Sequence, residues 1–148
     1  MMLGIEMEHD REVGTMYLHH HTSIMRVLKK GSIDNMRVSP VPCTIDLFKR
    51  LKAHAYTNTE SEVQEIDEYH TPYRMYLGVI GHWAQTSMPQ LKTTVRIGSK
   101  YMSRPTKVHF ELVMMMLRYC IYCVVNNTKL TLRRPRGFDG VLELLKPS

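Results

Sequence analysis

The strongest constraint on the fold is an apolar repeat with helical spacing that runs without a slip from residue 108 to residue 123. Its members recur at i, i+4, i+7, i+8, i+11 and i+15: Val108, Leu112, Met115, Met116, Tyr119 and Cys123. Because an α-helix turns once in 3.6 residues, these positions share one face, which must be buried against other elements. Thr106 is a suitable N-cap for this helix.

Two further helical signals precede this one. The first recurs at i, i+4, i+7 and i+11, with Trp83 beside it: Tyr73, Leu77, Ile80 and Ala84. Gly78 and Gly81 interrupt it, each at a cost of about 1 kcal/mol relative to alanine, which suggests close packing or the close approach of a bulky group. After a break at Pro89, a second stripe runs to the stretch 103–105: Leu91, Val95, Gly98 and Met102. Short connections between the three helices predict a helical subdomain.

Strands are predicted near the start of the chain. Leu3, Ile5 and Met7 alternate with more polar residues, which is the period of a half-buried strand. Turn-forming residues at 10–14 lead into a second strand at 15–18, so a hairpin is expected. A short helix should follow and end at Gly31, with these apolar and capping residues: Ile24, Val27 and Leu28 on its buried face, and Thr22 or Ser23 at its start.

Residues 32–71 have poor periodicity, contain Pro40 and Pro42, and are predicted to form a long loop. A small basic cluster lies in the first half of this segment: Lys49, Arg50 and Lys52. The second half carries five acids and no Lys or Arg, which is typical of a solvated connection: Glu60, Glu62, Glu65, Asp67 and Glu68. A general acid/base role for these carboxylates is the alternative, although such pairs need burial and positioning.

Short strands are also predicted at 130–132 and 141–144. Since the chain stops just beyond the second, we expect a truncation there. The expected fold is α+β, with an N-terminal β-hairpin, a short helix, a long loop, a three-helix thumb-like subdomain and two short C-terminal strands. The expected divisions are a hairpin and helix at 1–31, a linker at 32–71, a helical part at 72–124 and a final segment at 125–148.

The composition indicates a folded, basic protein. The 148 residues are 43% hydrophobic and carry a net charge of +6, so a polyanion such as nucleic acid is a reasonable partner. Three cysteines are too few for a disulfide framework, and the first residues do not resemble a signal peptide. We therefore expect an intracellular protein, in the cytoplasm or nucleus, with no membrane partner and no small-molecule substrate.

Several short stretches, in order and at fitting distances, carry a family resemblance. They are Leu3-Gly4-Ile5-Glu6 to Gly14-Thr15-Met16, Pro72-Tyr73-Arg74 with Leu77-Gly78, Ser99 to Thr106 with His109-Phe110, Leu117-Arg118-Tyr119, and Leu130 to Gly140. Together they resemble the reverse transcriptase of copia-type retrotransposons, in the region that follows the polymerase active site. The corresponding family strings are LGIEI before a GT strand, PYR, SRFM-x-x-P-x-x-x-HW, LRYL, and LTLRP with WDG.

The resemblance implies that the chain covers the end of the palm, the thumb and the connection toward RNase H. Leu3 and Gly4 would then lie at the hairpin that grips the primer strand. Arg74, Gly78 and His82, spaced i, i+4 and i+8, would face the nucleic acid from the thumb helix. The alternative is a surface helix whose Gly78 packs against a neighbouring helix.

The resemblance also implies what this chain lacks. The family's polymerase acids lie in a Tyr-x-Asp-Asp turn and its RNase H acids in a Ser-Asp-x-Asp stretch, and neither string occurs here. The parent enzyme would use Mg²⁺, which clustered carboxylates must hold. We therefore expect no cofactor and no polymerase or nuclease activity from this chain alone. Departures from the family at 87–90 and 121–123 indicate sequence decay.

Two other groups of residues are candidate sites. Lys92, Arg96, Lys100 and Arg104 recur at i+4 steps and form a basic stripe, which would contact phosphates or would simply be a solvated helix face. The second group combines the cysteines at 120 and 123 with the histidines at 19–21. These residue types bind zinc, but a single CxxC without a second pair more often marks ordinary buried cysteines, so we expect no metal.

The sequence thus leads to two functional hypotheses. The first is a truncated, degenerate, non-catalytic piece of a copia-type reverse transcriptase polyprotein, with weak sequence-independent binding to an RNA/DNA duplex. The second is a stand-alone basic interaction module that binds a protein or nucleic acid. Only the first requires binding that falls steeply with salt and shows no sequence preference.

Overall fold

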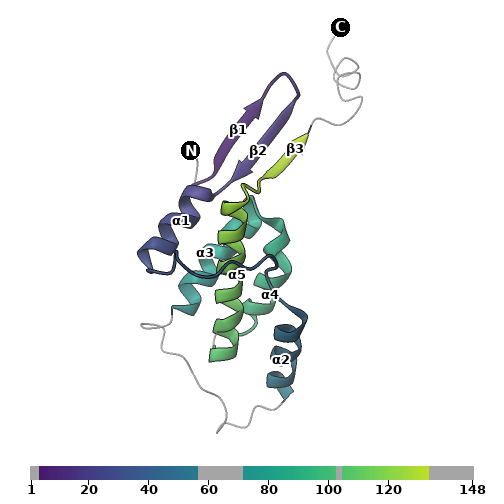
Figure 1. The fold of residues 1–148 in the computed structure, drawn as a ribbon. Helices are drawn as coiled ribbons and strands as arrows, with labels where there is room; N and C mark the ends of the chain where they lie inside the picture. Colours follow the sequence, from purple (N-terminus) through teal and green to yellow (C-terminus); the bar gives the residue numbers. More distant parts are fainter. Residues whose placement is uncertain (1–3, 57–71, 103–104, 134–148) are drawn as a thin grey trace, which may run out of the picture.

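The computed structural model describes residues 4–56, 72–102 and 105–133. In these residues a three-stranded antiparallel sheet accompanies five α-helices, so the α+β prediction is confirmed. The sheet extends away from one end of the helical part (Figure 1). The elements are β1 (Glu6–Asp10), β2 (Thr15–His19), α1 (His21–Lys30), α2 (Ile45–Tyr56), α3 (Tyr73–Thr86), the short 3₁₀-helix η1 (Pro89–Leu91), α4 (Lys92–Ser99), α5 (Lys107–Val125) and β3 (Leu130–Arg133).

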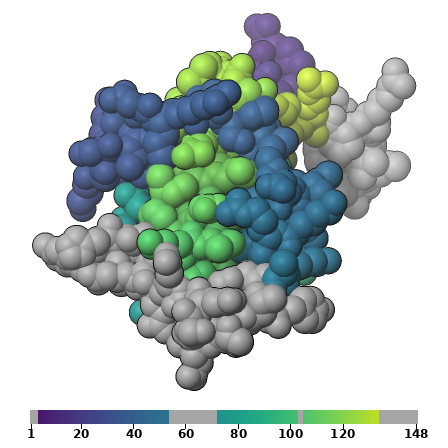
Figure 2. Space-filling model, turned by 60° about the horizontal axis from the view of Figure 1, so that its bottom comes forward, coloured from purple at the N-terminus to yellow at the C-terminus, as the bar shows by residue number. Residues whose placement is uncertain are grey.

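The central element is α5, as the apolar repeat predicts. Thr106 is its N-cap and forms a capping box with His109, in which the His109 Nδ1 accepts the Thr106 N–H at 2.9 Å. The helix ends at Asn126, and the left-handed φ of 53° at Asn127 lets the Thr128 N–H donate to the Cys123 carbonyl. Each of the other four α-helices contacts α5 directly. Figure 2 shows α1 and α2 beside it on one face.

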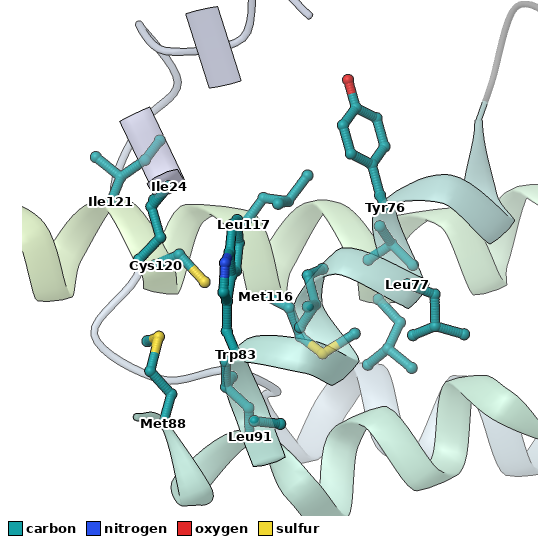
Figure 3. Close-up of a cluster of buried hydrophobic side chains, with 14 of the residues drawn as sticks. Ile24, Tyr76, Leu77, Trp83, Met88, Leu91, Met116, Leu117, Cys120 and Ile121 are labelled. Atoms are coloured by element: carbon teal, nitrogen blue, oxygen red, sulfur yellow. The ribbon is translucent and has the colours of Figure 1, made fainter. Parts of the chain in front are cut away.

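A single apolar cluster joins the helices. Trp83 is 1% exposed, and its indole lies among Met116, Leu117 and Cys120 of α5 (Figure 3). Ile24 of α1 and Leu47 of α2 belong to the same buried cluster. Fully burying such a side chain contributes roughly 1.5–3 kcal/mol. The segments before and after residue 72 therefore share one core.

The helix α5 also has the length and mean hydropathy, 1.6, that would suit a membrane span. The same composition suits the core helix of a soluble protein, and 44% of that window is buried inside the fold.

The predicted hairpin is present in the structure, and a third strand is added to it. Its first strand differs from the prediction: β1 runs over Glu6–Asp10 at the edge of the sheet, and Met7, expected on a half-buried face, is 58% exposed. Asp10 Oδ1 accepts the N–H groups of Glu12 and Val13, and Gly14 has a φ of 71°, which a glycine adopts without strain. The strand predicted at 130–132 is confirmed as β3, and it pairs antiparallel with β2 so that Leu18 faces Leu130. The strand predicted at 141–144 lies outside the described residues.

The prediction of a loop throughout 32–71 is wrong, because α2 occupies its middle. Thr44 caps this helix by accepting the Leu47 N–H on its hydroxyl at 3.2 Å. Leu47 and Leu51, four residues apart, are both 2% exposed. These two positions supply an apolar stripe too narrow to stand out among the exposed cations of the helix. The acidic half of the predicted loop lies outside the described residues.

Two helix boundaries also differ from the prediction. Neither Thr22 nor Ser23 caps α1, since the N-cap residue is His20. The Glu6 carboxylate accepts the Thr22 N–H at 3.0 Å and so takes the place of a side-chain cap. Gly31 ends this helix as predicted. The stripe that the sequence extends to Met102 ends as an α-helix at Ser99 and continues in tighter turns, with the Tyr101 N–H bonded to the Gly98 carbonyl.

Candidate nucleic-acid interface

The helix α3 has one open face. Arg74 and Gly78 are exposed on it, whereas Tyr73, Leu77 and Ile80 are buried on the opposite side. A Cβ built on Gly78 would meet no atom within 4 Å. The alternative that Gly78 packs against a neighbouring helix is therefore wrong. This glycine instead leaves the exposed face of α3 without a side chain at its position.

The glycine that brings helices together is Gly98 of α4. A Cβ at this position would lie 3.1 Å from Leu77 Cδ1 and 3.3 Å from the Tyr73 hydroxyl oxygen, closer than ordinary van der Waals contact. The Tyr73 hydroxyl also donates a hydrogen bond of 2.6 Å to the Gly98 carbonyl. Burial raises the pKa of Tyr73, so this hydroxyl stays protonated as the donor. The sequence signal for this contact was only a glycine within an apolar stripe.

The basic stripe lies on the exposed side of α4. Lys92, Arg96 and Lys100 are exposed, whereas Thr94 and Gly98 on the other side are buried. None of the three cations forms an ion pair with another residue in the described part of the chain. Three charges of one sign thus face solvent over two turns of helix. Arg104, the fourth member, lies outside the described residues.

The basic stripe and the open face of α3 border one another. A Cβ on Gly81 of α3 would lie 3.7 Å from Val95 Cγ1 of α4, which is ordinary contact. Arg74 Nε donates to the Met102 carbonyl at 2.7 Å and so ties α3 to the turn after α4. The structure therefore brings Arg74 and Gly78 next to the stripe, with Arg74 held in place by an internal bond.

His82 and Gly4 have other neighbours. The half-buried His82 ring lies edge-on to His20, with ring centroids 5.5 Å apart. Gly4 has a φ of 77° and adjoins the start of α1, where a Cβ would be 3.6 Å from the Ser23 hydroxyl oxygen. Leu3 lies outside the described residues. The contacts of Gly4 and His82 are thus with α1 and with His20 just before it.

The histidine run at 19–21 forms the junction between the sheet and the helices, a role that no sequence pattern indicated. His19 Nε2 lies 3.4 Å from a Glu8 carboxylate oxygen on β1. His20 Nδ1 lies 2.5 Å from the Ser87 hydroxyl at the end of α3. His21 Nε2 lies 2.9 Å from the Thr128 carbonyl, just before β3. Three consecutive side chains therefore reach three different elements.

The environment of His20 alters its titration. Burial, followed by the nearby His82 and His19, lowers the pKa of His20 to about 4, although Glu6 opposes the shift. The imidazole is therefore neutral at pH 7, with Ser87 on Nδ1 and Thr86 at 3.4 Å from Nε2. It lines a cavity of about 240 Å³ together with Ser87, Cys123 and Lys129.

The structure places Cys123 at the same cavity as the histidine run but does not assemble a metal site there. In residues 4–56, 72–102 and 105–133, no group of three or more His, Cys, Asp or Glu is arranged to hold an ion. Cys120 is fully buried, and burial raises the pKa values of both thiols, which disfavours the thiolate that a metal would require.

Comparison with known proteins identifies no relative: no family model, no curated protein and no solved structure matches the chain.

Proposed function

We propose that the chain is a non-catalytic thumb-and-connection segment of a copia-type retrotransposon reverse transcriptase, and that it binds the phosphate backbone of nucleic acid without sequence preference. The ordered motif strings support the family assignment, and the missing acid clusters support the lack of catalysis. The setting we propose is intracellular.

The observation that carries the binding proposal is the surface formed by α3 and α4. Lys92, Arg96 and Lys100 are exposed at i+4 steps, beside the face of α3 on which Gly78 presents no side chain. A duplex backbone can approach a surface of this kind closely, and cations spaced along one helix can each neutralise a phosphate. No base-reading geometry is required, so the binding depends on charge alone.

The test is fluorescence anisotropy with a labelled RNA–DNA hybrid duplex. Three phosphate contacts predict a slope of log K against log[salt] of about −2.7, which is a loss of about 40-fold between 50 and 200 mM salt. The variant Lys92→Gln/Arg96→Gln/Lys100→Gln is expected to weaken binding at least about tenfold at 0.1 M salt.

A matched variant separates the stripe from net charge. Arg11→Gln/Arg37→Gln/Lys49→Gln removes the same charge from exposed positions elsewhere and should leave affinity within about twofold. Equal losses in both triple variants, or an affinity that does not change with salt, would refute binding through the stripe.

A further inference from the structure

A second surface, on the opposite side of the core from the basic stripe in Figure 1, lies where α1 runs beside the end of α5. It is a shallow groove of about 520 Å³. Thr22, Met25, Arg26 and Lys29 line it from α1 at i, i+3, i+4 and i+7, which is one helix face. His21 and Val124 complete the lining.

The charge in this groove has one sign. Arg26 and Lys29 are exposed, and none of the six lining residues is acidic. Glu6 lies at the start of α1, where its carboxylate already accepts the Thr22 N–H and lies 3.7 Å from His19 Nε2. Neither cation forms an ion pair within the described ranges. The groove therefore attracts carboxylates.

The floor of the groove is apolar. Met25 and Val124 are half-buried and pack against the main apolar cluster, which holds them in place beneath the cations. A methionine side chain is unbranched and adapts to the shape of an incoming aliphatic group.

We propose that this groove is a docking site for an acidic peptide segment, with one aliphatic side chain seated between Met25 and Val124 and flanking carboxylates paired with Arg26 and Lys29. A nucleic-acid backbone would satisfy the two cations but has no aliphatic group to cover the floor. An acidic peptide satisfies both, since charge provides the approach and the apolar contact provides specificity. The proposal does not depend on the nucleic-acid proposal, because it uses different residues on another helix.

The experiment uses the whole chain and a fluorescein-labelled peptide in which a single leucine is flanked by glutamates. Anisotropy should show saturable binding, and Arg26→Gln/Lys29→Gln should weaken it about fivefold or more, because two exposed ion pairs and the electrostatic steering are lost together. Replacing the leucine of the peptide with serine should weaken binding by a similar factor, about 1–2 kcal/mol of apolar burial. Amide shifts in an NMR titration should concentrate on α1 and at Val124.

The matched control is Arg37→Gln/Lys49→Gln, which removes two exposed charges elsewhere and should leave peptide affinity unchanged. Equal binding of the serine peptide would overturn the proposal, as would an equal loss in the control variant. Loss of duplex binding in Arg26→Gln/Lys29→Gln, or displacement of the peptide by phosphatidylserine vesicles, would instead make the groove a nucleic-acid or lipid surface and would also overturn it. The variant Lys92→Gln/Arg96→Gln/Lys100→Gln should retain full peptide binding whether or not it affects the duplex.

Discussion

At the residue scale, His20 shows how the fold alters side-chain chemistry. The imidazole is 1% exposed, is bonded to Ser87, and has His82, His19 and Glu6 as its titratable neighbours. Its pKa of about 4 in the folded chain lies below the ordinary histidine value of 6.5, so the unfolded chain binds more protons than the folded chain between these values. The stability that depends on neutral His20 is therefore fully present above pH 6.5 and is lost as the pH falls toward 4.

We expect the free energy of unfolding in urea to fall by about 2 kcal/mol between pH 7 and pH 5, since one pKa unit corresponds to about 1.4 kcal/mol. In His20→Asn, whose amide can still bond Ser87 but does not titrate, most of this slope should disappear. Glu6 and Glu8 do not contribute in this window. Their pKa values are lowered by hydrogen bonds from Thr22 and Lys129, so their stabilisation is lost only at pH values below 4.5.

An unchanged slope in His20→Asn would show that another group is responsible. His21 is the nearest alternative, because burial also lowers its pKa. His21→Asn is therefore the matched comparison, and it should flatten the pH profile less than His20→Asn does.

At the scale of helices and strands, the contact between α3 and α4 separates two glycines that look equivalent in the sequence. Gly78 and Gly98 both lie inside helices that carry an apolar stripe. Only Gly98 has atoms crowding the place of its missing Cβ, and both of these atoms belong to buried side chains. The two positions should therefore respond oppositely to the same substitution.

Gly78→Ala is expected to raise the free energy of unfolding by about 0.5–1 kcal/mol, because alanine favours the helix and meets only open space. Gly98→Ala gains the same propensity but must displace Leu77 and Tyr73, and overpacking costs about 1–3 kcal/mol. The net effect should be a loss of about 1 kcal/mol. Chemical denaturation of both variants measures this, and a stabilised Gly98→Ala would show that the helices separate at little cost.

The same scale shows what could be predicted from the sequence. The helices α3 and α5 could be predicted because each has an apolar stripe of several turns, and Thr106 could be recognised as a cap. Among the α2 side chains that the structure describes, only Leu47 and Leu51 are buried, so the periodicity of this helix falls below what a pattern can distinguish from a loop. The pairing of β3 with β2 joins residues more than a hundred positions apart, and no local pattern encodes it. The basic stripe was visible in the sequence, but its position beside Gly78 depends on the packing of α4 against α3.

At the scale of the whole molecule, the net charge of +6 bears on how the proposed duplex binding should depend on metal ions. Phosphate contacts made by lysine and arginine release counterions and need no divalent bridge. Binding of the hybrid duplex at fixed ionic strength should therefore stay within about twofold when EDTA replaces Mg²⁺. A tenfold loss in EDTA would mean that carboxylates, rather than the basic stripe, mediate the contact through an ion.

The pairing of β3 with β2 also sets an order on folding. The turn at Asp10–Gly14 can bring β1 and β2 together as soon as both are made, whereas the third strand must await every residue up to Arg133. Closing so long a loop is slow compared with forming a hairpin or a helix. During synthesis, β2 therefore keeps one unpaired edge until α5 has been completed, and the growing chain is most exposed to mispairing with other chains in that interval.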